Sequence, residues 1–393
     1  MIQRSDIPLL LTGSMAALAG VGLARLAYTP LIPVLIQQGW FDATAAVYLG
    51  AANLLGYLLG ALSAHWLSER FRPRAVLAVC FTIIGLSFIC SAAPASFAWF
   101  FIWRLLSGIT GAILMVVGPS LALTRAPIER RAVVGPLVFC GVGLGALLSA
   151  TLLPLLMEFN LMWSWLALGS LALMTGIACD YGLARLPPAA APTTTSPAGA
   201  PPVLGTTIVL VMLAYAMDAT GFIPHTVFWV DYLAREQALG AQAAALQWAI
   251  FGAGAIVGPL FAGVLVHRLG WHRGLTIGYL LKSLAIALPF FAVGLASNSI
   301  SSFMVGALVP GLVALTSGRL AELGGPAQHK RLWGYATAVF AVMQAVSGYA
   351  MSGLYALLGT YQPLFALGGG LLAVGMLCVM LSGRFQPARK LSN

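Results

Sequence analysis

The sequence has few charged residues and lacks the motifs of the common enzyme active sites. Lys, Arg, Asp and Glu together make up 8% of the 393 residues, whereas a soluble domain has about 25%. The chain contains no HExxH zinc motif, no GxSxG nucleophile elbow, no P-loop and no glycine-rich dinucleotide motif after a strand. These absences argue against a soluble globular protein and against an enzyme.

Cysteine is also scarce, and its placement gives no sign of a disulfide framework. The five cysteines show no CxxC spacing and all lie in apolar stretches, where a free cysteine behaves as a small apolar side chain. Met212, Met217 and His225 come closest to a soft-metal site. The two methionines, however, are five residues apart and lie on different faces of a helix. We therefore predict no metal and no cofactor.

Long apolar runs, by contrast, fill most of the chain. A hydrocarbon core of about 30 Å is crossed by about 20 apolar helical residues, and the sequence offers twelve stretches of that kind. They are Ile7–Gln37, Ala43–Leu67, Ala75–Ala93, Phe97–Thr124, Ala132–Leu156, Leu161–Leu183, Leu204–Tyr232, Ala243–Val266, Leu275–Ala296, Ile300–Leu320, Gly334–Leu358 and Pro363–Leu381. Because lipid offers no hydrogen bonds to the backbone, each stretch should be helical. The predicted fold class is an all-α membrane protein with 12 transmembrane helices.

The net charge of +10 is explained by topology rather than by nucleic-acid binding. Of the twenty Lys and Arg residues, sixteen lie in segments on the side of both chain ends, and only Arg235 lies on the opposite side. This bias predicts cytoplasmic termini in a multi-pass protein of the cell inner membrane. The expected surroundings are the lipid bilayer, and no nucleic-acid partner is expected.

One low-complexity segment divides the chain into two parts. Residues 187–203 are almost entirely Pro, Ala and Thr, a composition that forms an extended tether and no packed core. The predicted domains are a six-helix bundle over residues 1–186 and a second six-helix bundle over residues 204–393. The tether should lie on the cytoplasmic side.

A basic loop in each half carries a family resemblance. The second-half loop has its characteristic residues at Gly263, His267, Arg268, Gly270 and Arg273. It resembles the signature loop of the major facilitator superfamily, with His267 where the family has Asp. The first-half copy, from Gly60, keeps its arginines but also lacks the acid. In the fourth stretch, Arg104, Gly108 and Ala112 are similar to the family's fourth-helix motif. We expect the second-half loop to act in gating.

A finer resemblance is to the YbfB/YjiJ-like branch of that superfamily. It rests on Gly22–Pro33 in the first stretch, Ala51–Ala61 in the second and Thr337–Gln344 in the eleventh. The resemblance implies the major facilitator fold, transport of a small-molecule substrate and a monomeric state. It leaves the substrate undefined.

Arg25 is the first candidate for substrate binding. It lies in the middle third of the first stretch, where an ionisable group is expensive and should face the bundle interior. A guanidinium binds carboxylate or phosphate bidentately, so Arg25 predicts recognition of an anion. The alternative is a purely structural ion pair.

Asp218 and His225 are the candidates for proton coupling. They lie seven residues apart in the seventh stretch and so share nearly one helix face. Aligning Pro30 with Pro224 sets Arg25 beside Asp218, which predicts an ion pair across the central cavity. The pair would be either static or exchanged for substrate and a proton. His225 could instead be an ordinary hydrogen-bonding helix contact.

Other polar and aromatic residues in the stretches complete the predicted site. The predicted substrate-binding residues besides Arg25 are Tyr28, Asn53, Tyr57, Arg104, Phe222 and Gln344. The polar ones either line the cavity or join helices by hydrogen bonds. Lys282 is expected to reach the cytoplasmic surface with its charged head, and Asp231 is expected to be solvated.

Together these features predict a secondary active transporter that works by alternating access. The expected cargo is a small organic anion, moved in symport with protons. One alternative is an exporter of hydrophobic or amphipathic compounds, in which the charged pair is structural. A non-transporting membrane sensor is the second alternative, and it is disfavoured because the tether is too short to be a signalling domain.

Overall fold

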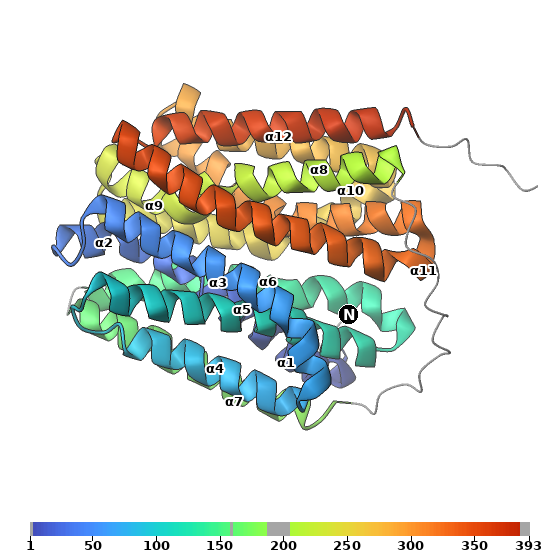
Figure 1. Cartoon of the computed structure of the whole chain (residues 1–393), viewed down its shortest axis with the longest axis horizontal. Helices are drawn as coiled ribbons and strands as arrows, with labels where there is room; N and C mark the ends of the chain where they lie inside the picture. The colour runs from blue at the N-terminus through green and yellow to red at the C-terminus, as the bar shows by residue number, and fades with distance from the viewer. Residues whose placement is uncertain (1–2, 158–159, 187–204, 386–393) are drawn as a thin grey trace, which may run out of the picture.

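The computed structural model describes residues 3–157, 160–186 and 205–385, and this part of the chain consists of helices with short connections, without a strand. Figure 1 shows the helices running roughly along the long axis of the molecule, with α1–α7 on one side and α8–α12 on the other. The predicted tether at residues 187–203 lies outside the described residues.

The helices of the first half follow the predicted apolar stretches. The first stretch comprises η1 (Arg4–Asp6), α1 (Ile7–Ala17), η2 (Leu18–Leu23), η3 (Leu26–Leu31) and α2 (Ile32–Gln37). The others are α3 (Ala43–Arg70), α4 (Pro73–Ile89), α5 (Phe97–Arg125), α6 (Ile128–Met157) and α7 (Leu161–Leu183). Three of these starts are capped: the side chains of Asp42, Ser96 and Asn160 accept backbone N–H groups of the first turns of α3, α5 and α7.

The second half contains fewer but longer helices. The seventh stretch comprises α8 (Thr206–Gly221), η4 (Pro224–Phe228), α9 (Trp229–Asp231) and η5 (Tyr232–Glu236), and it is followed by α10 (Gly240–Phe291), α11 (Leu295–Leu358) and α12 (Gln362–Ser382). The chain bends inside α10 at Gly270 (φ 77°) and inside α11 at Gly325 (φ 67°). These positive φ angles suit glycine because it has no Cβ. Each long helix therefore consists of two arms.

Ten helical segments of the described chain are long and apolar enough to cross a membrane. Each of the predicted stretches contains helix within its described residues, but two features give ten candidate spans instead of twelve. The helix α4 has 17 residues and falls short in length, and α10 continues through Gly270 as one segment of 52 residues. The chain is therefore a multi-pass, all-α membrane protein.

Glycines bring the same helix pairs together in both halves. A Cβ on Gly60 of α3 would lie 2.1 Å from the backbone oxygen of Ile109 in α5, and a Cβ on Gly258 of α10 would lie 2.0 Å from that of Ala307 in α11. Such contacts leave no space for a side chain, so the backbones pack directly. Three glycines of the first half have counterparts in the second half that make the corresponding contacts. The pairs are Gly56 and Gly254, Gly60 and Gly258, and Gly108 and Gly306, and the residue numbers differ by 198 in each pair.

The two groups of helices meet mainly where α6 packs on α10 and where α3 packs on α11. At the first interface Gly143 lies against Ile256 and Gly252 against Leu147. At the second, Gly348 lies against Leu54. The interrupted first and seventh stretches run between these two interfaces, and they position the candidate site.

Candidate functional site

The first membrane stretch is not a continuous α-helix, and its interruption creates the site. A π-helical segment (η2) ends at Leu23, and a 3-10 segment (η3) containing Pro30 begins at Leu26. Between them Arg25 has φ −108° and ψ −59°. A broken helix inside a membrane needs other partners for its freed backbone groups.

Three side chains from neighbouring helices provide those partners, and all donate to one atom. The carbonyl oxygen of Ala24 accepts hydrogen bonds from Arg104 Nη1 (2.9 Å), Asn53 Nδ2 (3.1 Å) and Ser107 Oγ (3.2 Å). Asn53 also donates to Ser107 Oγ at 2.9 Å. Residues of α3 and α5 thus hold the interruption in place. They also orient Arg25, the residue that follows Ala24.

Arg25 is buried at the boundary between the two halves. Its side chain is 9% exposed, its Nη1 donates to Gln344 Oε1 at 2.8 Å, and its guanidinium lies 5.0 Å from the ring centroid of Phe222. Its Nε and Nη2 atoms have no hydrogen-bond partner among the described residues. Two donors of a buried cation are therefore available to a ligand.

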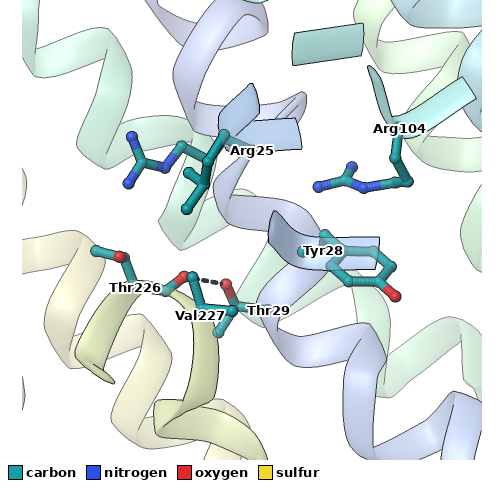
Figure 2. A pocket seen from close by; sticks show the side chains of 8 residues that line it. Arg25, Tyr28, Thr29, Arg104, Thr226 and Val227 are labelled. Atoms are coloured by element: carbon teal, nitrogen blue, oxygen red, sulfur yellow. Dashed lines mark hydrogen bonds between the residues drawn. The ribbon is translucent and has the colours of Figure 1, made fainter. Parts of the chain in front are cut away.

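A second buried arginine lines the same small cavity. Arg104 is 4% exposed, and its guanidinium lies 4.1 Å from the ring centroid of Tyr28. Its Nε has no partner within the described chain. The cavity is lined by Arg25, Tyr28, Thr29, Gly50, Leu54, Arg104, Thr226 and Val227. Figure 2 shows the two guanidinium groups apart from each other, with that of Arg104 over Tyr28 and that of Arg25 pointing away from it. The Thr29 hydroxyl donates to the backbone oxygen of Thr226 (2.6 Å) across the halves.

The structure brings most of the predicted substrate-binding residues together. Arg25, Tyr28 and Arg104 line the cavity, and Phe222 and Gln344 contact Arg25. Asn53 does not line the cavity; it donates to the Ala24 carbonyl, and its own Oδ1 has no partner in the described part of the chain. Tyr57 is half-buried one turn further along α3 and does not line the cavity. Ser107 was missed by the sequence reasoning, although it lies three residues after Arg104 on the same helix.

The predicted ion pair between Arg25 and Asp218 is wrong. The carboxylate of Asp218 pairs with Lys282 instead (Oδ1 to Nζ, 2.6 Å), and both side chains are 1% exposed. The expectation that Lys282 reaches the cytoplasmic surface is therefore also wrong. The alignment of Pro30 with Pro224 misled the prediction. The separation of 198 residues found for the glycine pairs places Arg25 level with Ile223, five residues beyond Asp218.

Asp218 and Lys282 nevertheless lie near the arginine site. The Lys282 nitrogen is 5.3 Å from the ring centroid of Phe222, the ring that also contacts Arg25. The second carboxylate oxygen of Asp218 has no partner among the described residues. The ring of Phe222 thus lies between Arg25 and the Lys282 that pairs with Asp218.

His225 is fully buried in the π-helical segment η4. Its hydrogen bonds indicate which nitrogen of the neutral ring carries the proton. Ser301 Oγ donates to the backbone oxygen of Ala285 (2.7 Å), so it accepts from His225 Nε2–H (2.7 Å). The Nδ1 atom is then the unprotonated nitrogen, and it has no partner among the described residues. The ring stacks on Trp229 with centroids 4.4 Å apart. His225 therefore has one free acceptor in an apolar surrounding.

Asp231 was expected to be solvated and is instead fully buried. It accepts from Arg235 Nε (2.6 Å) and from the Tyr361 hydroxyl (2.6 Å). These bonds tie the end of the seventh stretch to the start of α12. The expectation was wrong because Arg235, four residues further along the chain, and Tyr361 enclose the carboxylate at the helix end.

The predicted gating loop lies around the bend of α10. Gly270 provides the bend, while His267, Arg268 and Arg273 are exposed, as is Gly263. Among the described residues, no group of three or more His, Cys, Asp or Glu side chains is arranged to hold a metal ion.

The sequence of most of the chain is similar to that of a known protein family. Residues 17–380 match the family described as "Uncharacterised MFS-type transporter YbfB". The chain is similar to the uncharacterised MFS-type transporter YceJ of Bacillus subtilis (strain 168), with 25% identity over 283 residues, which is 69% of this chain and 70% of that protein. It is also similar to solute carrier family 22 member 6 of Mus musculus, with 33% identity over 97 residues, which is 25% of this chain and 18% of that protein. The resemblance found in the sequence is confirmed: the chain belongs to the YbfB-type family of major facilitator superfamily transporters.

Proposed function

We propose that this protein is a secondary active transporter that moves a small organic anion across the cytoplasmic membrane by alternating access, coupled to protons. The observation that carries the proposal is the burial of the Arg25 guanidinium without an acidic partner among the described residues. A guanidinium stays charged at any pH the protein meets, and a buried charge is stable only with a partner of opposite sign. Among the described residues its hydrogen-bond partner is the neutral amide of Gln344. An anionic substrate would supply the missing charge.

The proposed architecture has twelve passes in two six-helix bundles, residues 1–186 and 204–393, joined by the tether at 187–203. The repeated glycine packing of α3 on α5 and of α10 on α11 supports this division. We place both termini in the cytoplasm, in a monomer of the inner membrane, from the distribution of basic residues. The bend at Gly270 would then face the cytoplasm, where its exposed basic residues could take part in gating.

Alternating access requires contacts between the halves that can open and close around the site. The hydrogen bond between Thr29 and Thr226 is of this kind, since it joins the two interrupted stretches at the cavity. The bond between Arg25 and Gln344 also crosses the halves. A substrate that replaces Gln344 as the acceptor of Arg25 would therefore break a contact between the two halves, which have to move relative to each other.

For proton coupling we propose Asp218, with Lys282 as its partner, and His225 as a second acceptor. The neutral form of the Asp218 carboxyl group would release Lys282, whose charge would then act on the site through Phe222. His225 offers its free Nδ1 to a proton. Loss of the Asp218 carboxylate should therefore affect the driving of transport more than the binding of substrate.

The proposal is tested by ligand-induced thermal stabilisation of the purified protein with small carboxylates, phosphate esters and their neutral amides. We expect at least one anion to raise the melting temperature of the wild type, and Arg25→Gln to abolish that rise. Arg25→Lys should restore it poorly, because an ammonium lacks the planar fork of donors.

Gln344→Glu provides a variant that does not depend on survival of the Arg25 deletion. It places a carboxylate at the atom that now accepts from Arg25 at 2.8 Å. We expect a more stable protein that no longer responds to anions. The proposal fails if Arg25→Gln and Gln344→Glu both respond to anions like the wild type. Stabilisation by lipophilic cations alone would favour the exporter instead.

A further inference from the structure

We infer that the transported anion carries two separate carboxylate groups, one bound by Arg25 and the other by Arg104. The inference rests on the proposed function, because it specifies the class of anion for the same site. It goes further in one respect: it makes Arg104 a ligand of the substrate and sets the charge of the substrate at two.

The first argument is the balance of buried charge. The sequence has ten acidic residues, of which Glu158 lies outside the described residues. Two of the others, Asp218 and Asp231, are buried within the second half, and they are taken by Lys282 and Arg235. The remaining acids lie at helix ends or, in the case of Glu322, three residues before the bend of α11: Asp6, Asp42, Glu69, Glu129, Asp180, Glu236 and Glu322. Within the described chain, no acid pairs with Arg25 or Arg104.

Two buried arginines therefore line one cavity, and the described residues offer neither of them a compensating negative charge. They are 9% and 4% exposed, and their cation–π contacts with Phe222 and Tyr28 supply only part of the interaction that water would give. A single carboxylate would leave one of the two cations uncompensated. A doubly charged molecule neutralises both.

The second argument is the set of free donors. Nε and Nη2 of Arg25, Nε of Arg104 and Nε2 of Gln344 are all buried and have no acceptor among the described residues. Unused buried donors are costly. Here they belong to the two arginines that line one cavity and to Gln344, which contacts Arg25. The donor set of Arg25 and Gln344 suits one carboxylate, and Arg104 suits another.

The third argument is the direction of the side chains. In Figure 2 the guanidinium of Arg104 extends over Tyr28, whereas that of Arg25 points away from Arg104. The two groups do not converge on one point. A compact dianion such as a single phosphate would therefore reach only one of them, whereas a short carbon chain with an acid at each end would reach both. The rings of Tyr28 and Phe222 offer apolar contacts to such a chain.

Arg104 has a second role that must be separated from substrate binding. One of its nitrogens, Nη1, caps the carbonyl of Ala24, so a variant of Arg104 also loosens the interruption. Ser107 donates to the same carbonyl but carries no charge. Ser107→Ala is therefore the matched control: it weakens the cap and leaves the charge balance unchanged.

The test measures dissociation constants for the purified wild type and variants with malonate, succinate, glutarate and adipate. Each diacid is compared with its half-amide, which keeps the length and loses one charge, and a phosphate monoester serves as the compact dianion. We expect one diacid to bind the wild type at least tenfold more tightly than its half-amide and than the phosphate ester. Arg104→Gln should weaken the diacid by at least tenfold and leave the half-amide unchanged, while Ser107→Ala should keep the preference for two charges.

Several results would overturn the inference. Equal binding of diacid and half-amide by the wild type would show that one charge is sufficient. Tighter binding of the phosphate ester would favour a compact dianion. Loss of the preference in Ser107→Ala as complete as in Arg104→Gln would reduce Arg104 to a positioning residue. In each of these cases an anion site at Arg25 would remain. If no anion binds, or if Arg25→Gln binds all of them like the wild type, the proposed function fails as well.

Discussion

The buried pair of Asp218 and Lys282 makes a quantitative prediction about stability. Its atoms are 2.6 Å apart and both side chains are 1% exposed. With an effective dielectric constant of about 20, two unit charges at this distance attract each other by about 6 kcal/mol. The cost of removing both from water offsets much of that gain. Deleting one partner nevertheless leaves a bare buried charge, which costs about 3–5 kcal/mol.

Asp218→Asn and Lys282→Met should therefore each destabilise the protein by about 3–5 kcal/mol, whereas the double variant should recover most of the loss. The assay is equilibrium unfolding in detergent, analysed as a double-mutant cycle. The coupling free energy between the two positions should be at least about 2 kcal/mol. A second cycle, Asp218→Asn with Arg25→Gln, serves as the control and should give a much smaller coupling, because Arg25 bonds to Gln344.

The reverse ranking would refute this reasoning. If Asp218 couples more strongly to Arg25 than to Lys282, the charged groups are paired as the alignment of Pro30 with Pro224 suggested. A double variant as unstable as the sum of the two single variants would show that the 2.6 Å contact contributes no interaction of its own.

Two further predictions concern coupling and packing. In liposomes the Asp218→Asn/Lys282→Met variant should still exchange substrate across the membrane but should not accumulate it when a pH gradient is imposed; accumulation at the wild-type level would remove Asp218 from proton coupling. Gly258→Ala should destabilise the protein by about 2 kcal/mol or more, because its Cβ would lie 2.0 Å from the backbone oxygen of Ala307. Gly263→Ala in the same helix, where a Cβ meets open space, is its control in the same unfolding assay, and an equal loss in both variants would contradict the packing argument.

Much of the fold could be predicted because lipid restricts the choice of structure. Every apolar stretch of sufficient length had to be a helix, and the boundaries were close: the predicted span Leu161–Leu183 coincides with α7. The prediction treated α10 and α11 as pairs of separate helices. Whether a short connection is a loop or a bend depends on a single backbone angle, such as that of Gly270, and apolar periodicity does not report it.

The site was predicted less completely, because it depends on departures from the regular helix. Arg25 could be assigned to the interior from its depth in the apolar stretch alone. Its partners could not, since the π and 3-10 segments on both sides of it change the direction of each following side chain. A usable signal was present in the Gly56–Gly60 and Gly254–Gly258 pairs, whose equal spacing would have set the register between the halves and argued against pairing Arg25 with Asp218.

The acceptor on which Asn53, Arg104 and Ser107 converge is a peptide oxygen, that of Ala24. No side-chain replacement at position 24 deletes it, so scanning mutagenesis would detect its three neighbours one by one and overlook the atom they share. Drift in the sequence can remodel the surroundings of this oxygen while the oxygen itself persists. The atom that anchors the site thus belongs to the main chain, so a comparison of amino-acid sequences alone does not detect it.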